Sequence, residues 1–416
     1  MIASSKTGLK SNLSKRFPQG FLWGSASSAH QVEGNNVGSD WWSWEEGGCL
    51  ESSGVACDHY HRFEEDFDLA KSLNQNAHRL SIEWARIEPE EGRWDGEEIK
   101  HYRQVLDSLR SRGIKSFVSL WHFTLPLWFA QKGGFEKASN LKYFERFVRL
   151  CAREFGEKVN FWITVNEPLG YAWSAYGVGF WPPQKKHLAS AFRVYFNLVR
   201  AHRKAYRAIK GVIPRAEAGP ALNMAAIHYH GKNPLMVLGV RSFERFFNRS
   251  FLFLSRGFFD FIGVNYYFHH DLSLNSFSLE VNKKLAEQMM LMEKKGHGSF
   301  FYPRGLYEVL IKLKKYRKPV YITENGIADA KDKIREKFIV GHLSWAHKAL
   351  GEGIDLRGYL HWSLTDNFEW AFGFKPRFGL VEIDYKTLKR RVRPSAQVYA
   401  QVCKTNTVVS DVQKPA

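Results

Sequence analysis

Two glutamates that each belong to a short apolar run are the residues of this chain whose types and spacing best suit chemistry. Glu167 lies in Phe161-Trp162-Ile163-Thr164-Val165-Asn166-Glu167-Pro168, and Glu324 lies in Val320-Tyr321-Ile322-Thr323-Glu324-Asn325-Gly326. Runs of β-branched and aromatic residues that stop at Pro or Gly are typical of β-strands. A single Glu at a strand end usually does no more than face solvent, but two carboxyl groups flanking one bond are what cleavage of a glycosidic linkage requires. The pair makes a glycosidase the first hypothesis.

Eight apolar segments rich in β-branched and aromatic residues recur along the chain, and amphipathic stretches such as Ile99–Arg112 and Ala189–Ile209 separate them. Strands that alternate with helices indicate parallel βα units, and eight such units predict an α/β protein with a single (β/α)8 TIM barrel. Catalytic groups of such barrels lie at the carboxyl ends of the strands, where both glutamates are expected. The expected strands are Phe21–Ser27, Ala77–Trp84, Ser116–His122, Phe161–Glu167, Ala216–Asn223, Phe261–Tyr267, Val320–Glu324 and Gly358–Leu364.

The domain organisation follows from the absence of any Pro/Ser-rich linker or composition shift along the 416 residues. A single α/β barrel routinely exceeds 250 residues, so the length does not require a second domain. We expect one catalytic barrel over residues 17–404, an N-terminal extension over 1–16, and a polar C-terminal tail over 405–416 that frays.

Targeting and cysteine usage favour the cytoplasm. No apolar run reaches the roughly 18 residues of a membrane-spanning helix, and residues 1–16 lack the apolar core of a secretory signal. Cys49 and Cys57 share one Gly/Ser-rich loop and could pair in an oxidising compartment, although free thiols are favoured. No Cys/His spacing resembles a zinc site, so neither a metal nor another cofactor is expected.

The formal net charge of +18 is the property that fits a glycosidase least obviously. A strongly basic chain can indicate nucleic acid or an acidic membrane surface as a partner. The basic runs Arg200–Lys210 and Lys312–Lys318 nevertheless read as exposed helix faces, and no nucleic-acid-binding motif accompanies them. We therefore expect neither nucleic acid nor membrane as a partner, while a homo-oligomer stays open.

Polar and aromatic residues occupy the ends of several expected strands, where a core would prefer Val or Leu. Each has an ordinary structural explanation, such as a core histidine or a tryptophan that only packs. The expected convergence of these polar and aromatic side chains on one face of the barrel instead indicates a binding site for a polyhydroxylated ring. Such a site offers many short hydrogen bonds and a flat apolar surface. The polar groups are Gln31, Arg79, His122, Asn166 and Glu369, and the aromatic walls are Trp362 and Trp370.

Taken together, these segments resemble family 1 of the glycoside hydrolases, a β-glucosidase/β-galactosidase family of retaining (β/α)8 barrels. The resemblance runs from Phe17 to Tyr399, and the segments 40–45 and 358–363 look closer to the archaeal-type branch. The motifs that carry it are Phe21-Leu22-Trp23-Gly24, Cys57-Asp58-His59-Tyr60-His61-Arg62, Thr164-Val165-Asn166-Glu167-Pro168, Ile322-Thr323-Glu324-Asn325-Gly326 and Asp366-Asn367-Phe368-Glu369-Trp370.

The resemblance implies a role for each site residue. Glu167 would be the acid/base and Glu324 the nucleophile of a double displacement on terminal, non-reducing β-D-glucosyl, galactosyl or fucosyl residues. The small-molecule β-glycoside would be the only partner needed. Residues expected to support the nucleophile are Arg79, Asn265 and Tyr267, and those expected to bind the sugar are Gln31, His122, Asn166, Trp362, Glu369, Trp370 and Phe378.

Three alternatives stay beside this hypothesis. A 6-phospho-β-glycosidase would carry Ser in place of Glu369, and Lys and Tyr in place of Pro376 and Phe378, and none of these is present. A non-catalytic sugar-binding barrel would be expected to lack one of the two carboxylates. A transglycosylating enzyme fits the residues equally well, because the stretches 224–258 and 269–298 look short for the family and suggest an open leaving-group side.

Overall fold

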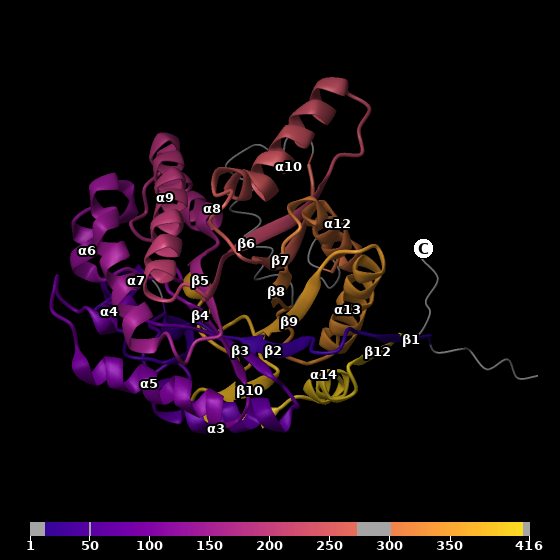
Figure 1. Cartoon of the computed structure of the whole chain (residues 1–416), viewed down its shortest axis with the longest axis horizontal. Coiled ribbons are helices and arrows are strands. Elements are labelled where there is room, and N and C mark those ends of the chain that lie inside the picture. The colour runs from indigo at the N-terminus through magenta and orange to yellow at the C-terminus, as the bar shows by residue number, and fades with distance from the viewer. Residues whose placement is uncertain (1–12, 50, 273–300, 411–416) are drawn as a thin grey trace, which may run out of the picture.

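The computed structural model describes residues 13–49, 51–272 and 301–410, and its centre is a closed barrel of eight parallel strands (Figure 1). Strand β9 pairs with β2 to close the ring, so the predicted TIM barrel is confirmed. Several strands are buried along their whole length, as expected for parallel strands with the barrel interior on one side and helices on the other. The barrel strands are β2 (Leu22–Ala26), β3 (Ala77–Ser81), β4 (Lys115–Ser119), β5 (Phe161–Asn166), β6 (Glu217–His228), β7 (Ile262–Asp271), β8 (Val320–Asn325) and β9 (Leu356–Trp362).

Helices surround this ring (Figure 1). Helix α5 begins where the Asp95 carboxylate accepts hydrogen bonds from the backbone N–H groups of Glu97 and Glu98, which also suit the positive end of a helix. None of the described helices is both long enough and apolar enough to cross a membrane. The main outer helices are α3 (His59–Ser72), α5 (Gly96–Ser111), α7 (Leu141–Phe155), α9 (Leu188–Val212), α10 (Pro234–Leu254), α12 (Pro303–Leu313), α13 (Arg335–Gly351) and α14 (Pro394–Thr405).

Short helices fill the loops between these elements. They are α1 (Ala29–Val32), α2 (Asp40–Trp44), η1 (Glu45–Cys49), α4 (Trp84–Ile87), α6 (Leu127–Gln131), η2 (Gly134–Glu136), η3 (Ala138–Asn140), α8 (Pro168–Tyr171), η4 (Ala172–Gly177), η6 (Lys314–Tyr316) and η7 (Trp370–Phe372).

The barrel interior is apolar near the amino ends of the strands and polar near their carboxyl ends. Phe117 and Phe161 stack with ring centroids 4.3 Å apart, and Phe261 meets Tyr321 edge-on at 5.4 Å. These four rings fill the floor of the barrel. The polar side chains of the candidate site therefore stand on a closed, rigid base.

Two segments near the ends of the described chain form a separate two-stranded sheet, in which β1 (Leu13–Arg16) pairs antiparallel with β12 (Thr407–Ser410). The expectation that the C-terminal tail frays is therefore wrong for Thr407–Ser410. These four residues form a strand because β1 supplies the backbone hydrogen-bond partners that a short polar segment cannot supply by itself.

A hairpin of β10 (Val381–Asp384) with β11 (Lys389–Val392) leads to a residue that explains part of the basic charge. Just beyond it, the buried Arg393 donates to both carboxylate oxygens of Asp366 over 2.8 and 2.9 Å. Such bidentate pairing fixes geometry as well as charge. At least this part of the positive charge serves the fold.

The cysteine expectation is settled for Cys57. Its thiol is buried and free, and it donates to the backbone carbonyl of Asp366 over 2.8 Å. The free thiol that was favoured over a Cys49–Cys57 disulfide is confirmed at this position, while the side chain of Cys49 lies outside the described residues.

Candidate active site

The two glutamates lie at the carboxyl ends of β5 and β8, on the polar side of the barrel. Glu324 is buried and pairs in register with Asn265 of β7. Glu167 directly follows β5 and has a left-handed backbone, with φ of +43°. A positive φ is uncommon for a residue with a side chain, and such conformations cluster at functional sites. The backbone N–H of Glu167 donates to Ala221 of β6 over 2.8 Å, which holds this turn in place.

Arg79 and Tyr267 hold the two oxygens of Glu324. The guanidinium of Arg79, which is fully buried, forms an ion pair with Oε1, and the Tyr267 hydroxyl donates to Oε2 over 2.8 Å. Arg79 is itself oriented by Ser119 Oγ at 3.1 Å and Asn166 Oδ1 at 2.7 Å. Hydrogen bonds from a cation and a hydroxyl favour the ionised form of this carboxyl group.

Asn265 links the acidic pair. Its amide nitrogen donates to Glu167 Oε1 over 2.8 Å and to Asn166 Oδ1 over 3.0 Å. Its amide oxygen accepts from the Thr323 hydroxyl over 2.7 Å. Because Asn166 Oδ1 accepts from Arg79, it must be an oxygen, so the end of Asn265 that contacts it and Glu167 is the N–H donor.

The two carboxyl groups differ in their surroundings. Burial, followed by the negative charge of Glu324, raises the pKa of Glu167 to about 8, and the side chains that hydrogen-bond to it are the neutral amides of Asn265 and Asn223. Burial also raises the pKa of Glu324, although Arg79 and Tyr267 oppose that rise. Each of these two neighbours lowers the pKa of Glu324, but loss of hydration outweighs them, so the net direction is upward.

A second cluster sits between β2, β9 and the segment after β9. The Gln31 amide nitrogen donates to Asn367 Oδ1 and to the Phe368 carbonyl, both at 2.8 Å. Trp362 donates its indole N–H to Glu369 Oε1 over 3.1 Å. Burial raises the pKa of Glu369 to about 8, so this group carries a proton for much of the time at neutral pH in the sugar-free protein.

Aromatic rings line the same space. The His122 ring lies nearly parallel to Trp362, with centroids 5.9 Å apart, and to Trp370, at 6.0 Å. Burial and the neighbouring Arg79 push the pKa of His122 well below its usual range, so the imidazole is neutral. Phe378 meets Tyr267 edge-on at 6.3 Å and is buried. All twelve residues expected at the site therefore lie in one connected group.

The structure adds polar residues that the sequence reasoning did not place in the site. Thr323 and Ser119 orient Asn265 and Arg79. Asn223 of β6 lies beside Glu167, and its amide oxygen is buried without a hydrogen-bond partner in the described parts of the chain. Asn223 is the last residue of an expected strand, and Asn265 lies two residues from the end of the next one. This similar position was the signal in the sequence that could have placed Asn223 in the site.

Comparisons with known proteins identify the family of the chain. The family model for Glycosyl hydrolase family 1 matches residues 13–256 and 247–408. "Beta-glucosidase A" of Thermotoga maritima is 34% identical over 94% of this chain and 98% of its own, and a "Beta-galactosidase" of Pyrococcus woesei is 30% identical over 96% and 99%.

Solved structures give the same result. The "beta-glycosidase from Pyrococcus horikoshii" superposes with a TM-score of 0.86 at 37% identity, covering 96% of this chain and 97% of its own. The family 1 glucosidase of Thermotoga maritima, solved in complex with isofagomine lactam, gives a TM-score of 0.86 at 31% identity, covering 95% and 100%. The chain therefore belongs to glycoside hydrolase family 1 and is a β-glycosidase.

Proposed function

We propose that this β-glycosidase is a retaining exo-enzyme that releases terminal, non-reducing glucosyl, galactosyl or fucosyl residues by double displacement, with Glu324 as nucleophile and Glu167 as acid/base. The observation that carries the assignment is the difference between their partners. Glu324 has a cation and a phenol on its two oxygens, whereas neutral amides donate to Glu167. The proton shared by the pair therefore resides on Glu167.

In the first step, a Glu324 oxygen bonds to the anomeric carbon while the bond from that carbon to the leaving oxygen breaks. Glu167 gives its proton to the leaving oxygen, so the aglycone departs as an alcohol. Burial and the charge of Glu324 hold the pKa of Tyr267 well above its usual value, so its hydroxyl remains a donor to Glu324 throughout.

In the second step, Glu167 removes a proton from water, and the water oxygen displaces Glu324 from the anomeric carbon. Once Glu324 is esterified it has no charge, so the pKa of Glu167 falls and the residue can serve as a base. Two inversions at one carbon give net retention.

A neighbour that the two carboxyl groups share, Asn265, supports retention over inversion. Retaining enzymes place them about 5–5.5 Å apart, whereas inverting enzymes leave space for a water between them. Here Asn265 donates directly to Glu167 and is the register partner of Glu324 on the next strand. One side chain therefore spans much of the distance.

The sugar would be held by groups that suit hydroxyls and a flat ring face. Gln31 and Glu369 offer donors and acceptors on one side, Asn166 and His122 on the other, and Trp362 with Trp370 supplies the apolar surface. A carboxyl group at position 369 accommodates O4 in either epimer, which supports both gluco and galacto substrates.

A panel of nitrophenyl β-glycosides, with the products followed by NMR, tests the proposal. We expect release of β-configured glucose, galactose or fucose as the first product. An α-configured first product would exclude the retaining mechanism. Accumulation of sugar–sugar or sugar–alcohol products would favour the transglycosylase. A cytoplasmic location remains part of the proposal. The open leaving-group side also remains part of it, since residues 273–298 of the second stretch lie outside the described residues.

A further inference from the structure

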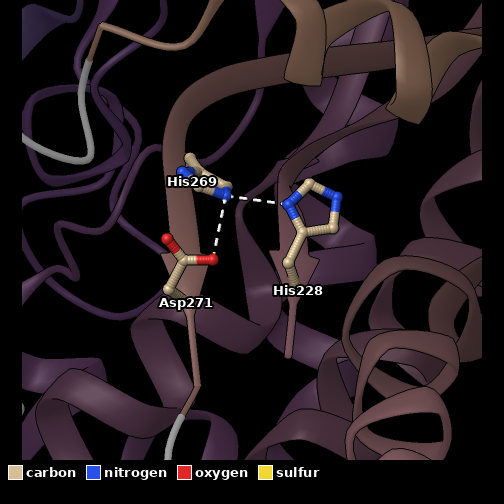
Figure 2. A group of neighbouring side chains, drawn as sticks. All are labelled: His228, His269 and Asp271. Carbon is tan, nitrogen blue, oxygen red and sulfur yellow. Dashed lines mark hydrogen bonds and ion pairs between the residues drawn. The ribbon is translucent and has the colours of Figure 1, made fainter. Parts of the chain in front are cut away.

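Strands β6 and β7 continue past the segments expected from the sequence, and their ends carry a cluster of histidines with an aspartate. The extensions pair in register as Ala226 with His269 and His228 with Asp271. Figure 2 shows that His228, His269 and Asp271 point toward one another. None of the three is among the residues assigned above to the glycosidase site.

The cluster lies where β6 and β7 pack against α12 and the residue just before it. Between the pairs Met224–Tyr266 and Ala226–His269, one residue of β6 lies opposite two residues of β7, so β7 has a bulge. Tyr267 accordingly donates to Glu324 inside the barrel, whereas His269 stacks on Tyr302, just before α12, at 4.2 Å. The bulge therefore lies between the part of β7 that contacts the candidate active site and the part that carries the histidine cluster.

The atoms that could coordinate an ion lie close together. His228 Nδ1 is 2.8 Å from His269 Nε2, which is 3.5 Å from Asp271 Oδ1, and all three atoms lie within 4.8 Å of one another. Tetrahedral zinc with bonds of 2.0–2.1 Å needs ligand atoms about 3.3 Å apart. The present distances lie on both sides of that value, so small side-chain rotations suffice.

A carboxylate behind His228 sets its ring for coordination. Glu308 of α12 accepts a hydrogen bond from His228 Nε2 over 2.8 Å. With the proton on Nε2, the lone pair of Nδ1 points toward His269. A histidine that donates its other nitrogen to a carboxylate is the usual outer support of a zinc ligand. A further imidazole, that of His230, lies 3.0 Å from Asp271 Oδ1.

We propose that His228, His269 and Asp271 bind one divalent transition-metal ion, with zinc as the expected occupant and Glu308 as the outer carboxylate. Two imidazoles and one carboxylate suit zinc, copper or nickel better than magnesium or calcium, which prefer oxygen ligands. The remaining position would be taken by water or His230. The ion would join the ends of β6 and β7 to each other and, through Glu308, to α12.

The test is titration of the chelator-treated full-length protein with ZnCl₂ by calorimetry, with metal analysis after dialysis. We expect one zinc per chain, a loss of affinity of at least tenfold in His269→Ala and Asp271→Asn, and a loss of about 10–100-fold in Glu308→Gln. His61→Ala is the matched control, because it removes an exposed histidine that pairs with an aspartate, Asp58, at 2.7 Å. That control should bind zinc as the parent does.

Cobalt supplies a second readout that a change in folding alone would not reproduce. Co²⁺ bound by this cluster should show the strong visible absorption of a four-coordinate ion, and His269→Ala should lose it while keeping its circular dichroism. Asp271 is more than half exposed, so Asp271→Asn keeps the test valid if the histidine variant does not fold. A parent protein without stoichiometric zinc, or variants that bind as tightly as the parent, would overturn the proposal.

Discussion

Thr323 donates its hydroxyl hydrogen to the amide oxygen of Asn265 over 2.7 Å, so the residue next to Glu324 in the chain holds in place the amide that donates to Glu167. Both groups are fully buried. This bond couples the orientation around the two proposed catalytic carboxyl groups, although Thr323 touches neither of them with its hydroxyl.

Replacing Thr323 by Val should therefore impair catalysis from a position outside the sugar contacts. The variant keeps the shape but leaves the Asn265 oxygen unpaired, which costs about 1–3 kcal/mol of the free energy of unfolding. Because the released amide of Asn265 no longer holds Glu167 in place, we expect kcat/KM to fall by about 5–150-fold, the factor for a transition-state loss of the same size. Thr323→Ser retains the hydroxyl and is the control. Equal activity of the Val and Ser variants would show that the bond does not matter for the reaction.

Glu324→Ala should remove turnover while leaving the fold intact, because a retaining mechanism has no substitute for its nucleophile. Added azide should restore part of the rate and give a glycosyl azide of inverted anomeric configuration, which NMR identifies. Glu324→Gln, nearly isosteric, should be inactive and should not be rescued. Near-native rates without azide would mean that the nucleophile is another residue.

Glu167→Ala should harm substrates with poor leaving groups far more than activated aryl glycosides. General acid help contributes about 10²–10⁴-fold, and an activated leaving group does not need it. The parent enzyme should also lose kcat/KM as the pH rises through about 8, where burial places the pKa of Glu167, since the acid form is then lost. This alkaline limb should disappear in the variant. The same loss on both substrate types would contradict the acid/base role.

The sequence predicts the strands well because their apolar runs are dictated by burial on two faces, as in β8. The sixth expected strand ends at Tyr267, because Phe268-His269-His270-Asp271 lacks the apolar pattern of a buried strand. The proposed metal cluster was missed because it lies on this continuation. The pairing of β12 with β1 and the net pKa direction of Glu324 depend on groups distant in the chain. Neither can be read from local sequence.

Glu369→Ser should alter sugar selection rather than the chemical step. Glu369 contacts the indole of Trp362 and not the proposed reacting groups, so losing its carboxyl group should raise KM for glucosides and galactosides more than it lowers kcat. The parent should reject 6-phosphorylated sugars, since the phosphate would lose its hydration beside the buried Glu369 and would meet the negative charge of Glu324. Kinetics with matched phosphorylated and plain nitrophenyl glycosides checks this. A parent that prefers the phosphorylated sugar would refute this role of Glu369.

Salt should have little effect on the reaction, despite the net charge of +18. The proposed substrate is neutral, so the field of the protein has no charge on which to act during the encounter. Exposed charges are also screened beyond about 8 Å at physiological ionic strength, whereas Arg79 is buried against Glu324 and is not exposed to that screening. We therefore expect kcat/KM for a neutral nitrophenyl glycoside to stay nearly constant from low to moderate NaCl.

A sulfated or uronic glycoside, measured in parallel, is the control that should respond if the basic surface does attract anions. A steep fall for the neutral substrate itself would contradict the prediction, and a marked preference for the anionic one would identify an acidic sugar as the natural substrate.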